Sequence, residues 1–459
     1  MVHQVSAPDA RLDRSDWLTL RVLLLGAVMP LLDATLVTVA LPTIGVELAA
    51  SMELLQWVTS GHALGAVSAV ALSAWFTRRL GSKRIWCGGL WLFLLGTCLC
   101  ALADSLHHLI FGRVLQGIAT GLLLPTMQTI LIEAVGKSRA RAALSAMSVP
   151  SVLIPILGPA VAGISLQYLD WRTLFWAHAP VCLVAIYWAH KRLQPGTCVP
   201  GLSVDVRGFL LLCPSLVLIL FGLSTAGGDG GYREAGLLVA GMTLMVAFVS
   251  HAKRRGASAL LEIGIFSSVR FSASASLALV SSTAYYGGML FFPIYLLQAG
   301  HLGPVWTGLV LAMHGVGMLI ARPRLSGLCR RWGDRRVAIL AVVIALVGSL
   351  ILFPPWILGN AYLLVLGMMM RGAGIGLLTL LALAGAYDGL DAAQLGHASA
   401  LTRIATLLGA ALGASVVALA LTSVHVLFPA VEEANFQLGN WVLMAVVLAC
   451  AGPSLCLRR

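Results

Sequence analysis

Residues Trp17–Leu41 read WLTLRVLLLGAVMPLLDATLVTVAL, an apolar stretch that contains one carboxylate, Asp33. The stretch is long enough for a helix to cross a hydrocarbon core about 30 Å thick. An ionisable group at the centre of such a helix costs about 2.5 kcal/mol or more, so it normally faces a partner or a wet cavity. The sequence therefore predicts a membrane-spanning helix in which Asp33 has a function. A carboxylate at a helix end among lipid headgroups is the alternative.

The composition of the whole chain is that of a membrane protein. Hydrophobic residues make up 59% and charged residues 10% of the 459 residues, whereas soluble domains carry about 25% charged residues. We expect an all-α membrane protein with about fourteen spans. Hydropathy places them at 18–41, 54–76, 85–103, 108–134, 142–168, 173–190, 207–225, 235–250, 271–298, 305–321, 337–358, 361–386, 393–422 and 437–456.

The net charge of +12 follows the order of these spans. Of the 30 lysines and arginines, 25 lie in the segments 11–21, 78–84, 137–141, 191–207, 253–270, 322–336 and 458–459, all predicted on one side. Cytoplasmic loops carry such an excess, so we expect both termini in the cytoplasm and no nucleic-acid partner. One predicted cytoplasmic loop is acidic instead, with Asp388 and Asp391.

The remaining composition points to neither a cleaved signal nor a metal site. The first span is too long for a secretory signal, acidic residues precede it and no small-residue cleavage site follows it. The nine cysteines fall mostly within apolar segments and lack metal-site spacing, so we expect them to be packing residues. We expect no bound metal and no cofactor.

The chain repeats itself after about 250 residues. The loop sequence RRLGSKR at 78–84 recurs as RRWGDRR at 330–336, an offset of 252. Further pairs follow in the same order: Pro42 with Pro293 at 251, Gly158 with Gly409 at 251 and, loosely, Arg113 with Arg371 at 258. Four matches at nearly one offset are hard to attribute to chance.

The repeat divides the chain into units. We expect a cytoplasmic tail at 1–17, a six-helix bundle at 18–192, two inserted spans within 193–256 and a second six-helix bundle at 257–459. Parallel repeats of this kind are a known transporter architecture, in which the binding site lies near the midplane between the halves.

Several motifs resemble those of one transporter family. The stretch LDATLVTVALPTI at 32–44 is similar to the first-span signature of the fourteen-span drug/proton antiporters, the EmrB/QacA-like branch of the major facilitator superfamily. Further resemblances are RVLQG at 113–117 to the fourth-span arginine motif, GPAVAG at 158–163 to the fifth-span antiporter motif, DWR at 170–172 to the entry of the sixth span, and FPIYLLQ at 292–298 to the end of the ninth. The resemblance implies the major facilitator fold and proton-driven export.

The chain also departs from the family pattern. Arg78 stands where the family often has an aspartate, which puts the interdomain contact of that aspartate in doubt. His62 stands where many relatives have tyrosine, and His178 where many have asparagine. The thirteenth span carries Arg403 and no carboxylate, unlike the corresponding span of some exporters of polyvalent cations.

Proton coupling needs a group that binds a proton on one side and releases it on the other. Burial raises the pKa of a carboxylate and a nearby arginine lowers it. A rocking motion of the two halves that changes either can therefore move the pKa of the carboxylate across the pH of the cell. We take Asp33 as that group and Arg113 as the residue that shifts its pKa. The alternative is that Arg113 only braces the helix bundle. His62 is a candidate relay or a core histidine. His314 and His425 are treated as core histidines, and Glu133 as interfacial.

Other residues are assigned by type. Gly158, Pro159 and Gly163 would bend the fifth span and let it pack closely. The loop residues Arg78, Arg79, Gly81, Lys83 and Arg84 would set topology, contact lipid phosphates or engage helix ends. Candidate cavity residues are Trp57, Tyr285, Tyr286, Met289, Arg371 and Arg403.

We therefore expect a proton-coupled antiporter of the bacterial inner membrane, a monomer that exports small amphipathic drugs by alternating access. Two alternatives remain: a dedicated exporter of one natural product or anionic or zwitterionic metabolite, and a non-transporting receptor or assembly protein on the same fold. No HExxH, GxSxG or phosphate-binding loop is found in the sequence, so we do not expect an enzyme. Whether a periplasmic adaptor protein is a partner is left undetermined by the sequence.

Overall fold

The computed structural model describes residues 12–48, 52–136, 139–196, 198, 204–224, 231–298, 304–353, 359–391, 394–427 and 432–457. Within these ranges the regular structure is helical, as expected for an all-α protein. The first half contains α1 (Arg14–Glu47), α2 (Met52–Leu80), α3 (Ser82–Ala101), α4 (Leu106–Val135), α5 (Ala140–Tyr168), α6 (Arg172–Trp176) and α7 (His178–Arg192). A hairpin follows, made of α8 (Val206–Ser224) and α9 (Gly231–Arg255).

The second half begins after the short 3₁₀ turns η1 (Gly256–Ser258) and η2 (Ile263–Ser267). Its elements are α10 (Val269–Gln298), α11 (Pro304–Ala321), η3 (Arg322–Arg324), α12 (Leu325–Trp332), α13 (Asp334–Ile351), α14 (Ala361–Gly385), α15 (Leu395–Leu427), α16 (Glu432–Ala449) and α17 (Ala451–Cys456).

Each of the fourteen apolar stretches coincides with one helix or with a consecutive pair. The sixth stretch is divided between α6 and α7, and the last between α16 and α17. By length and hydropathy, nine helical segments of the described chain qualify as membrane-spanning. The positions of the helices are thus predicted well by hydropathy, while the total of fourteen spans remains an expectation.

The two halves repeat each other in their turns and packing. Gly81 and Gly333 both adopt a positive φ, 87° and 79°, between a helix that ends at the preceding residue and one that begins at the next. Only glycine takes this conformation without strain, which explains the glycine in each loop. In the first half α4 packs between α2 and α3, and in the second half α14 packs between α11 and α13.

Glycines allow the same close approach of helices in both halves. A Cβ on Gly117 of α4 would lie 2.1 Å from the carbonyl oxygen of His62, and one on Gly372 of α14 would lie 2.0 Å from that of His314. Gly65 and Gly317 approach α4 and α14 in the same manner from the other side of each contact. Small residues that bring backbones together are typical of membrane helix pairs.

This packing corrects one of the matches made from the sequence. The helices α3 and α13 start 252 residues apart, but α4 and α14 start 255 apart, because the connection before α14 is longer. Gly96 packs against Gly112 and the backbone of Gln116, and Gly348 packs in the same way against Gly367 and the backbone of Arg371. Arg371 is therefore the counterpart of Gln116, one helical turn away from the position of Arg113.

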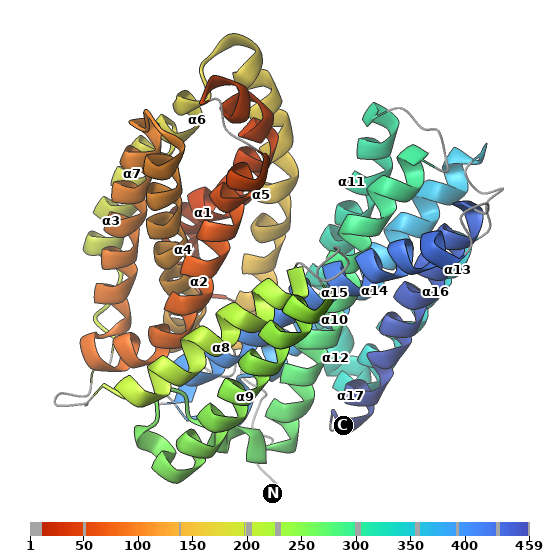
Figure 1. Ribbon diagram of the computed structural model, residues 1–459. Helices are drawn as coiled ribbons and strands as arrows, with labels where there is room; N and C mark the ends of the chain where they lie inside the picture. Colours follow the sequence, from red (N-terminus) through yellow and green to blue (C-terminus); the bar gives the residue numbers. More distant parts are fainter. Residues whose placement is uncertain are drawn as a thin grey trace, which may run out of the picture.

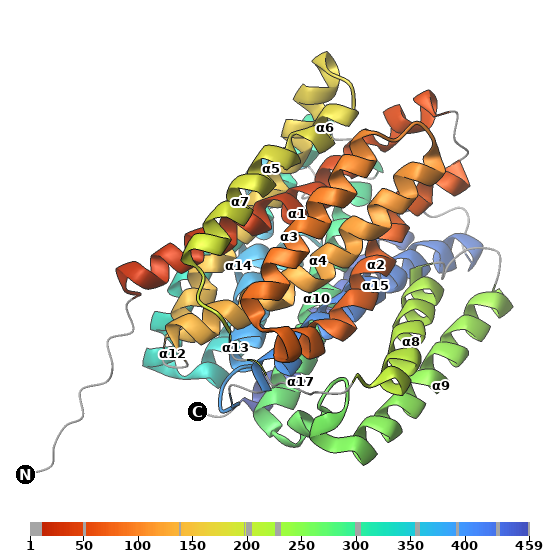
Figure 2. The same ribbon diagram turned by 90° about the vertical axis from the view of Figure 1, so that its left-hand side faces the viewer.

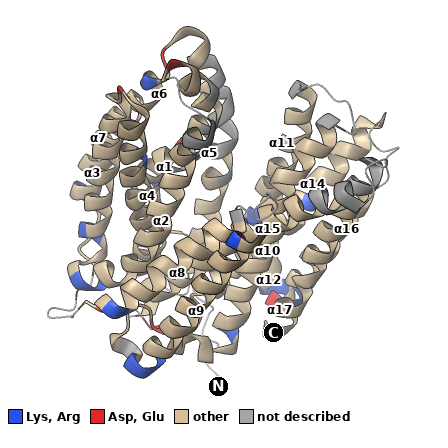
Figure 3. Ribbon diagram, in the orientation of Figure 1, with Lys and Arg blue, Asp and Glu red and all other residues tan. Residues whose placement is uncertain are grey.

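Figure 1 shows the two halves leaning apart from a shared base. The base carries the α2–α3 loop, the start of α5 and α12, and we call it the basic end because lysines and arginines concentrate there (Figure 3). The short helix α6 marks the opposite end. Turned by 90°, the α8–α9 hairpin is seen on one flank of the molecule (Figure 2).

The hairpin contacts both halves. The helix α8 packs against α9, against α2 of the first half and against α15 of the second. The start of α8 is held by Asp205, whose carboxylate accepts hydrogen bonds from the backbone N–H groups of Gly208 and Leu260. The same carboxylate pairs with His251 of α9 at 2.9 Å. Burial would raise the pKa of Asp205, but its hydrogen bonds, above all to His251, hold that pKa below the usual value.

Candidate functional site

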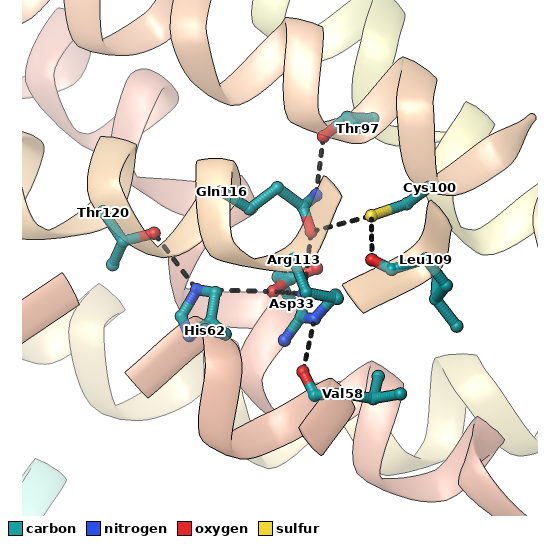
Figure 4. Close-up of polar contacts among 9 residues, drawn as sticks. All are labelled: Asp33, Val58, His62, Thr97, Cys100, Leu109, Arg113, Gln116 and Thr120. Atoms are coloured by element: carbon teal, nitrogen blue, oxygen red, sulfur yellow. Dashed lines mark hydrogen bonds and ion pairs between the residues drawn. The ribbon is translucent and has the colours of Figure 1, made fainter. Parts of the chain in front are cut away.

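The carboxylate predicted to matter lies in the interior of the first half. Asp33, in the middle of α1, has no exposed surface. Its Oδ2 accepts a hydrogen bond from Nη1 of Arg113 on α4 at 2.5 Å (Figure 4). The two residues, 80 positions apart, therefore form a buried ion pair, and the location among lipid headgroups that we considered is wrong.

Arg113 also holds other elements. Its Nε donates to the carbonyl oxygen of Val58 on α2 at 3.1 Å, and its Nη1 donates to Gln116 Oε1 at 2.8 Å. Gln116 in turn donates to the hydroxyl of Thr97 on α3 at 2.8 Å. The guanidinium thus joins α1, α2 and α4 directly and α3 through Gln116, so neutralisation of Asp33 and bracing of the bundle occur together.

His62 is the more accessible neighbour of the buried acid. Its Nε2 lies 3.8 Å from Asp33 Oδ2 and 3.4 Å from the hydroxyl of Thr120 on α4 (Figure 4). The side chain of His62 is 13% exposed, whereas that of Asp33 is fully buried. A partly accessible imidazole beside a buried carboxylate is a candidate for proton transfer, because its pKa lies near neutral pH in water.

The other oxygen of Asp33 has no hydrogen-bond partner in the described chain. Oδ1 is buried and unpaired, as are both ring nitrogens of His178 on α7. The charge of Asp33 reaches the His178 ring. His178 was noted from the sequence only as a departure from the family pattern; a second histidine near the acid could have been inferred only from the packing of α7 against α1.

In the second half Arg371 is buried, and no carboxylate of the described residues pairs with it. Its Nη2 donates to the carbonyl oxygen of Ala284 on α10 at 2.7 Å, and its guanidinium carbon lies 4.8 Å from the ring centroid of Phe292. A Cβ on Gly288 would lie 2.5 Å from both terminal nitrogens, so the glycine provides the space for the guanidinium. The geometry is that of a brace between α10 and α14.

The other candidate cavity residues are spread over two regions. Tyr285 and Tyr286 form an edge-to-face pair with centroids 4.9 Å apart, and Tyr286 lies within electrostatic range of Arg403. Met289 follows one turn along α10 and is partly exposed. Trp57 is elsewhere: its ring stacks on Phe221 of the inserted helix α8, with centroids 6.2 Å apart.

The loop motif at the basic end joins the two halves through a contact between an arginine and a histidine. Arg78 Nη1 lies 2.7 Å from His397 Nε2 in the first turn of α15. A guanidinium is always a donor, so His397 Nε2 accepts in this contact. Lys83 donates to the carbonyl oxygen of His190 at 2.8 Å, Arg79 is half-buried and Arg84 is exposed.

Of two further sequence-based assignments, the structure describes the one on α5 in part and Glu133 in full. The backbone of α5 is helical through Gly158, Pro159 and Gly163, but the burial and packing of these residues lie outside what the structure describes. Glu133 is exposed near the basic end and accepts a hydrogen bond from Ser82 at 2.7 Å.

A cluster that the sequence analysis missed ties the halves together at the basic end, and we call it the basic-end clasp. Arg141 of α5 donates two bonds to Asp334 of α13, at 2.6 and 2.8 Å, and a third to Asp388 at 3.1 Å. Arg270 of α10 pairs with the same carboxylates, at 2.9 and 2.6 Å. Burial would raise the pKa of Asp334, but the bonds and charge of Arg141 hold it below its usual range.

A second missed contact lies deeper between the halves. Arg322 donates from Nη1 to the carbonyl oxygen of Ser148 on α5 at 3.3 Å, and its own carbonyl oxygen accepts a bond from Ser145 at 2.7 Å. On the other side its Nη2 donates to Thr379 of α14 at 3.0 Å. Partners so far apart in the chain leave no local signal in the sequence.

Within the described ranges, no three histidine, cysteine or acidic side chains gather as a metal site would require. Asp33 and His62 provide groups for proton transfer, and the buried arginines provide groups for ion pairing.

Comparisons with known proteins agree with this architecture. The family model described as Major Facilitator Superfamily matches residues 23–414. The "Multidrug resistance protein B homolog" of Mycobacterium tuberculosis is 29% identical over 426 residues, which cover 91% of this chain and 78% of the relative. The "Putative multidrug resistance protein MdtD" of Salmonella paratyphi B is 28% identical over 366 residues, 78% of this chain and 76% of the relative.

A solved structure shows the same fold. The crystal structure of the human organic anion transporter MFSD10 (TETRAN) superposes with a TM-score of 0.64 over 95% of this chain and 99% of that one. The sequences are 16% identical, so the likeness concerns the arrangement of helices.

Proposed function

Since this chain belongs to the Major Facilitator Superfamily, we propose that it exports small amphipathic compounds across the bacterial inner membrane in exchange for protons. It is a multi-pass membrane transporter of the multidrug-resistance type by its relatives. Assignment to the fourteen-span drug/proton branch, proton coupling and antiport are our proposals. So are the division at 18–192, 193–256 and 257–459 and action as a monomer driven by the proton gradient without a cofactor.

One observation carries the proposal: the buried pair of Asp33 and Arg113, with His62 beside it. Placing ionisable groups inside the hydrocarbon region costs free energy, and such groups generally mark a functional site. A carboxylate next to a guanidinium stays ionised, and it takes up a proton when the guanidinium moves away. The pair therefore supports a proton site whose occupancy depends on the arrangement of the helices.

The contacts of Arg113 suggest how the proton could move the protein. When Asp33 is ionised, Arg113 holds α1 to α2 and α4. A proton that arrives through His62 neutralises the carboxylate and weakens the bond from α1 to Arg113. The first half then tilts relative to the second, which is the rocking motion expected for transporters built from repeats.

The test removes the titrating oxygen and preserves the shape. Asp33→Asn should abolish efflux driven by an imposed pH gradient in vesicles, and should leave the protein in the membrane. Asp104→Asn is the matched control, because Asp104 is an exposed carboxylate, 88% accessible, in the connection between α3 and α4. Asp104→Asn should transport normally.

A second measurement separates coupling from transport itself. Exchange of labelled for unlabelled compound across the membrane, with no gradient, needs rocking but no net proton movement. Asp33→Asn should keep part of this exchange while losing gradient-driven efflux. Normal gradient-driven efflux by Asp33→Asn would falsify the assigned role, and loss of transport in Asp104→Asn as well would show that the assay reports on general damage.

A further inference from the structure

The helices that surround the centre of the second half carry cations and no acids. The sequences of α10, α11, α14 and α15 contain no aspartate or glutamate. They contain Arg371 and Arg403 deep within the helices, and Arg322 follows directly after α11. In the first half, by contrast, the charge of Arg113 is cancelled by Asp33. The interior therefore has an excess of positive charge on one side.

Two of these arginines are occupied by neutral oxygen atoms. Arg371 donates to the carbonyl oxygen of Ala284 and lies over Phe292. Arg322 donates to two carbonyl oxygens and to the hydroxyl of Thr379. Both guanidinium groups thus have structural contacts, although neither forms an ion pair with a carboxylate of the described residues.

Arg403 is different, because its guanidinium has no hydrogen bond or ion pair within the described chain. It is partly exposed and lies in α15, which packs against α2 and α4 of the first half. Its charge reaches His62 on α2 and Tyr286 on α10. An arginine with five donors thus belongs to a helix that packs against the first half, and it pairs with no anion among the described residues.

An unpaired cation at membrane depth is costly, and such groups generally line the path of a substrate or ion. A carboxylate or sulfonate pairs with guanidinium through two parallel N–H···O bonds, which gives both energy and orientation. A cationic compound would instead be repelled by Arg403, and Asp33 cannot attract it because that carboxylate is buried and bonded to Arg113.

We propose that the exported compound carries an anionic group that binds Arg403, with its apolar part against the Tyr285–Tyr286 pair. This inference rests on the proposed export function and names its substrate class. Export of a monovalent anion in exchange for one proton is equivalent to moving two positive charges inward per cycle, one carried by the proton and one due to the departing anion. The membrane potential would therefore drive this transport more strongly than that of a neutral compound.

The binding test uses three probes that share one aromatic body: pyrenebutyrate, its primary amide and the corresponding trimethylammonium compound. Purified full-length protein in nanodiscs is titrated with each probe, without any gradient, and fluorescence anisotropy gives the Kd. Pyrenebutyrate should bind most tightly. Arg403→Gln should weaken its binding about tenfold to a hundredfold, the range for a hydrogen bond to a charged group.

Three comparisons make the result specific. Arg403→Lys keeps the charge but loses the fork of donors, so it should recover only part of the affinity. Arg254→Gln, an exposed arginine at the end of α9, should leave all three Kd values unchanged. Amide binding should change less than twofold or so in Arg403→Gln, which also shows that this variant is folded.

The outcomes separate this inference from the proposed function. Equal affinity for the three probes, tighter binding of the trimethylammonium compound, or an unchanged Kd for pyrenebutyrate in Arg403→Gln each overturns the anionic substrate. None of these results affects the coupling test at Asp33. If Asp33→Asn transports normally while Arg403→Gln loses pyrenebutyrate binding, proton coupling fails and the substrate class stands.

Discussion

Replacing Arg141 by glutamine should loosen the basic-end clasp without removing any contact inside either half. Arg141 is the only member of the clasp from the first half; Asp334, Asp388 and Arg270 all belong to the second. The side chains of Arg141 and Asp334 are 24% and 10% exposed, so the pair is partly shielded from water.

The size of the effect follows from these contacts. A hydrogen bond to a charged group contributes about 1.5–3 kcal/mol. Asp334 keeps its bond to Arg270 in the variant, so no carboxylate is left buried and unpaired, and the loss should be about 2 kcal/mol. Because 1.4 kcal/mol corresponds to about a factor of ten, the open fraction at the basic end should rise about thirtyfold.

The assay places a reporter thiol between the halves. Ser145 is 4% exposed and faces Arg322, so Ser145→Cys should react with a maleimide only when the basic end opens. The alkylation rate at this position, followed by peptide mass spectrometry, should increase about thirtyfold on adding Arg141→Gln. Arg270→Gln is the matched control, because it loses the same two carboxylates but breaks no contact between the halves.

Two results would refute the reasoning. An unchanged alkylation rate in Arg141→Gln would mean that the clasp does not hold the halves together. An equal increase in Arg270→Gln would mean that the effect is local disorder around Asp334 and Asp388 rather than separation of the halves.

Two further predictions follow. The pKa of Asp334 is held below its usual range, so the clasp is fully formed above the ordinary carboxylate pKa of about 4 and is lost only as pH falls below it. The ratio of alkylation rates with and without Arg141→Gln should therefore be the same at about pH 6 and about pH 8; a ratio that falls toward one at the lower pH would contradict this. Gly117→Ala should destabilise the protein by about 1–3 kcal/mol, because its Cβ would lie 2.1 Å from a backbone oxygen of α2. Gly88→Ala, whose Cβ would meet nothing within 4 Å, should leave the thermal unfolding temperature in nanodiscs unchanged, and equal stability of the two variants would show that this helix contact tolerates a side chain.

Local patterns in the sequence predicted the helices and the repeat. Apolar length is a property of each segment, so each of the fourteen stretches was found as a helix or a helix pair. The repeated loops were recognisable because both need a glycine with positive φ, at positions 81 and 333. The acidic loop that did not fit the charge pattern is now explained, since Asp388 pairs with Arg141 and Arg270.

Contacts over long sequence distances could not be predicted in the same way. The pairing of Asp33 with Arg113 was expected because both are rare charges in apolar helices. The match of Arg113 with Arg371 was wrong because these residues are 258 positions apart, whereas α4 and α14 start 255 apart, so Arg371 lies almost one turn beyond the true counterpart of Arg113. The clasp joins Arg141 to a carboxylate 193 residues away, and nothing in either neighbourhood indicates the other.

The α8–α9 hairpin has a mechanical consequence for any rocking of the halves. It touches α2 through Trp57 and Phe221, and α15 through the hydroxyl of Ser415, which donates to the carbonyl oxygen of Leu223. Both attachments lie on one flank of the molecule. A movement of the halves therefore strains the hairpin on this flank only. The halves should rotate about an axis close to the hairpin, so the opposite flank should move further.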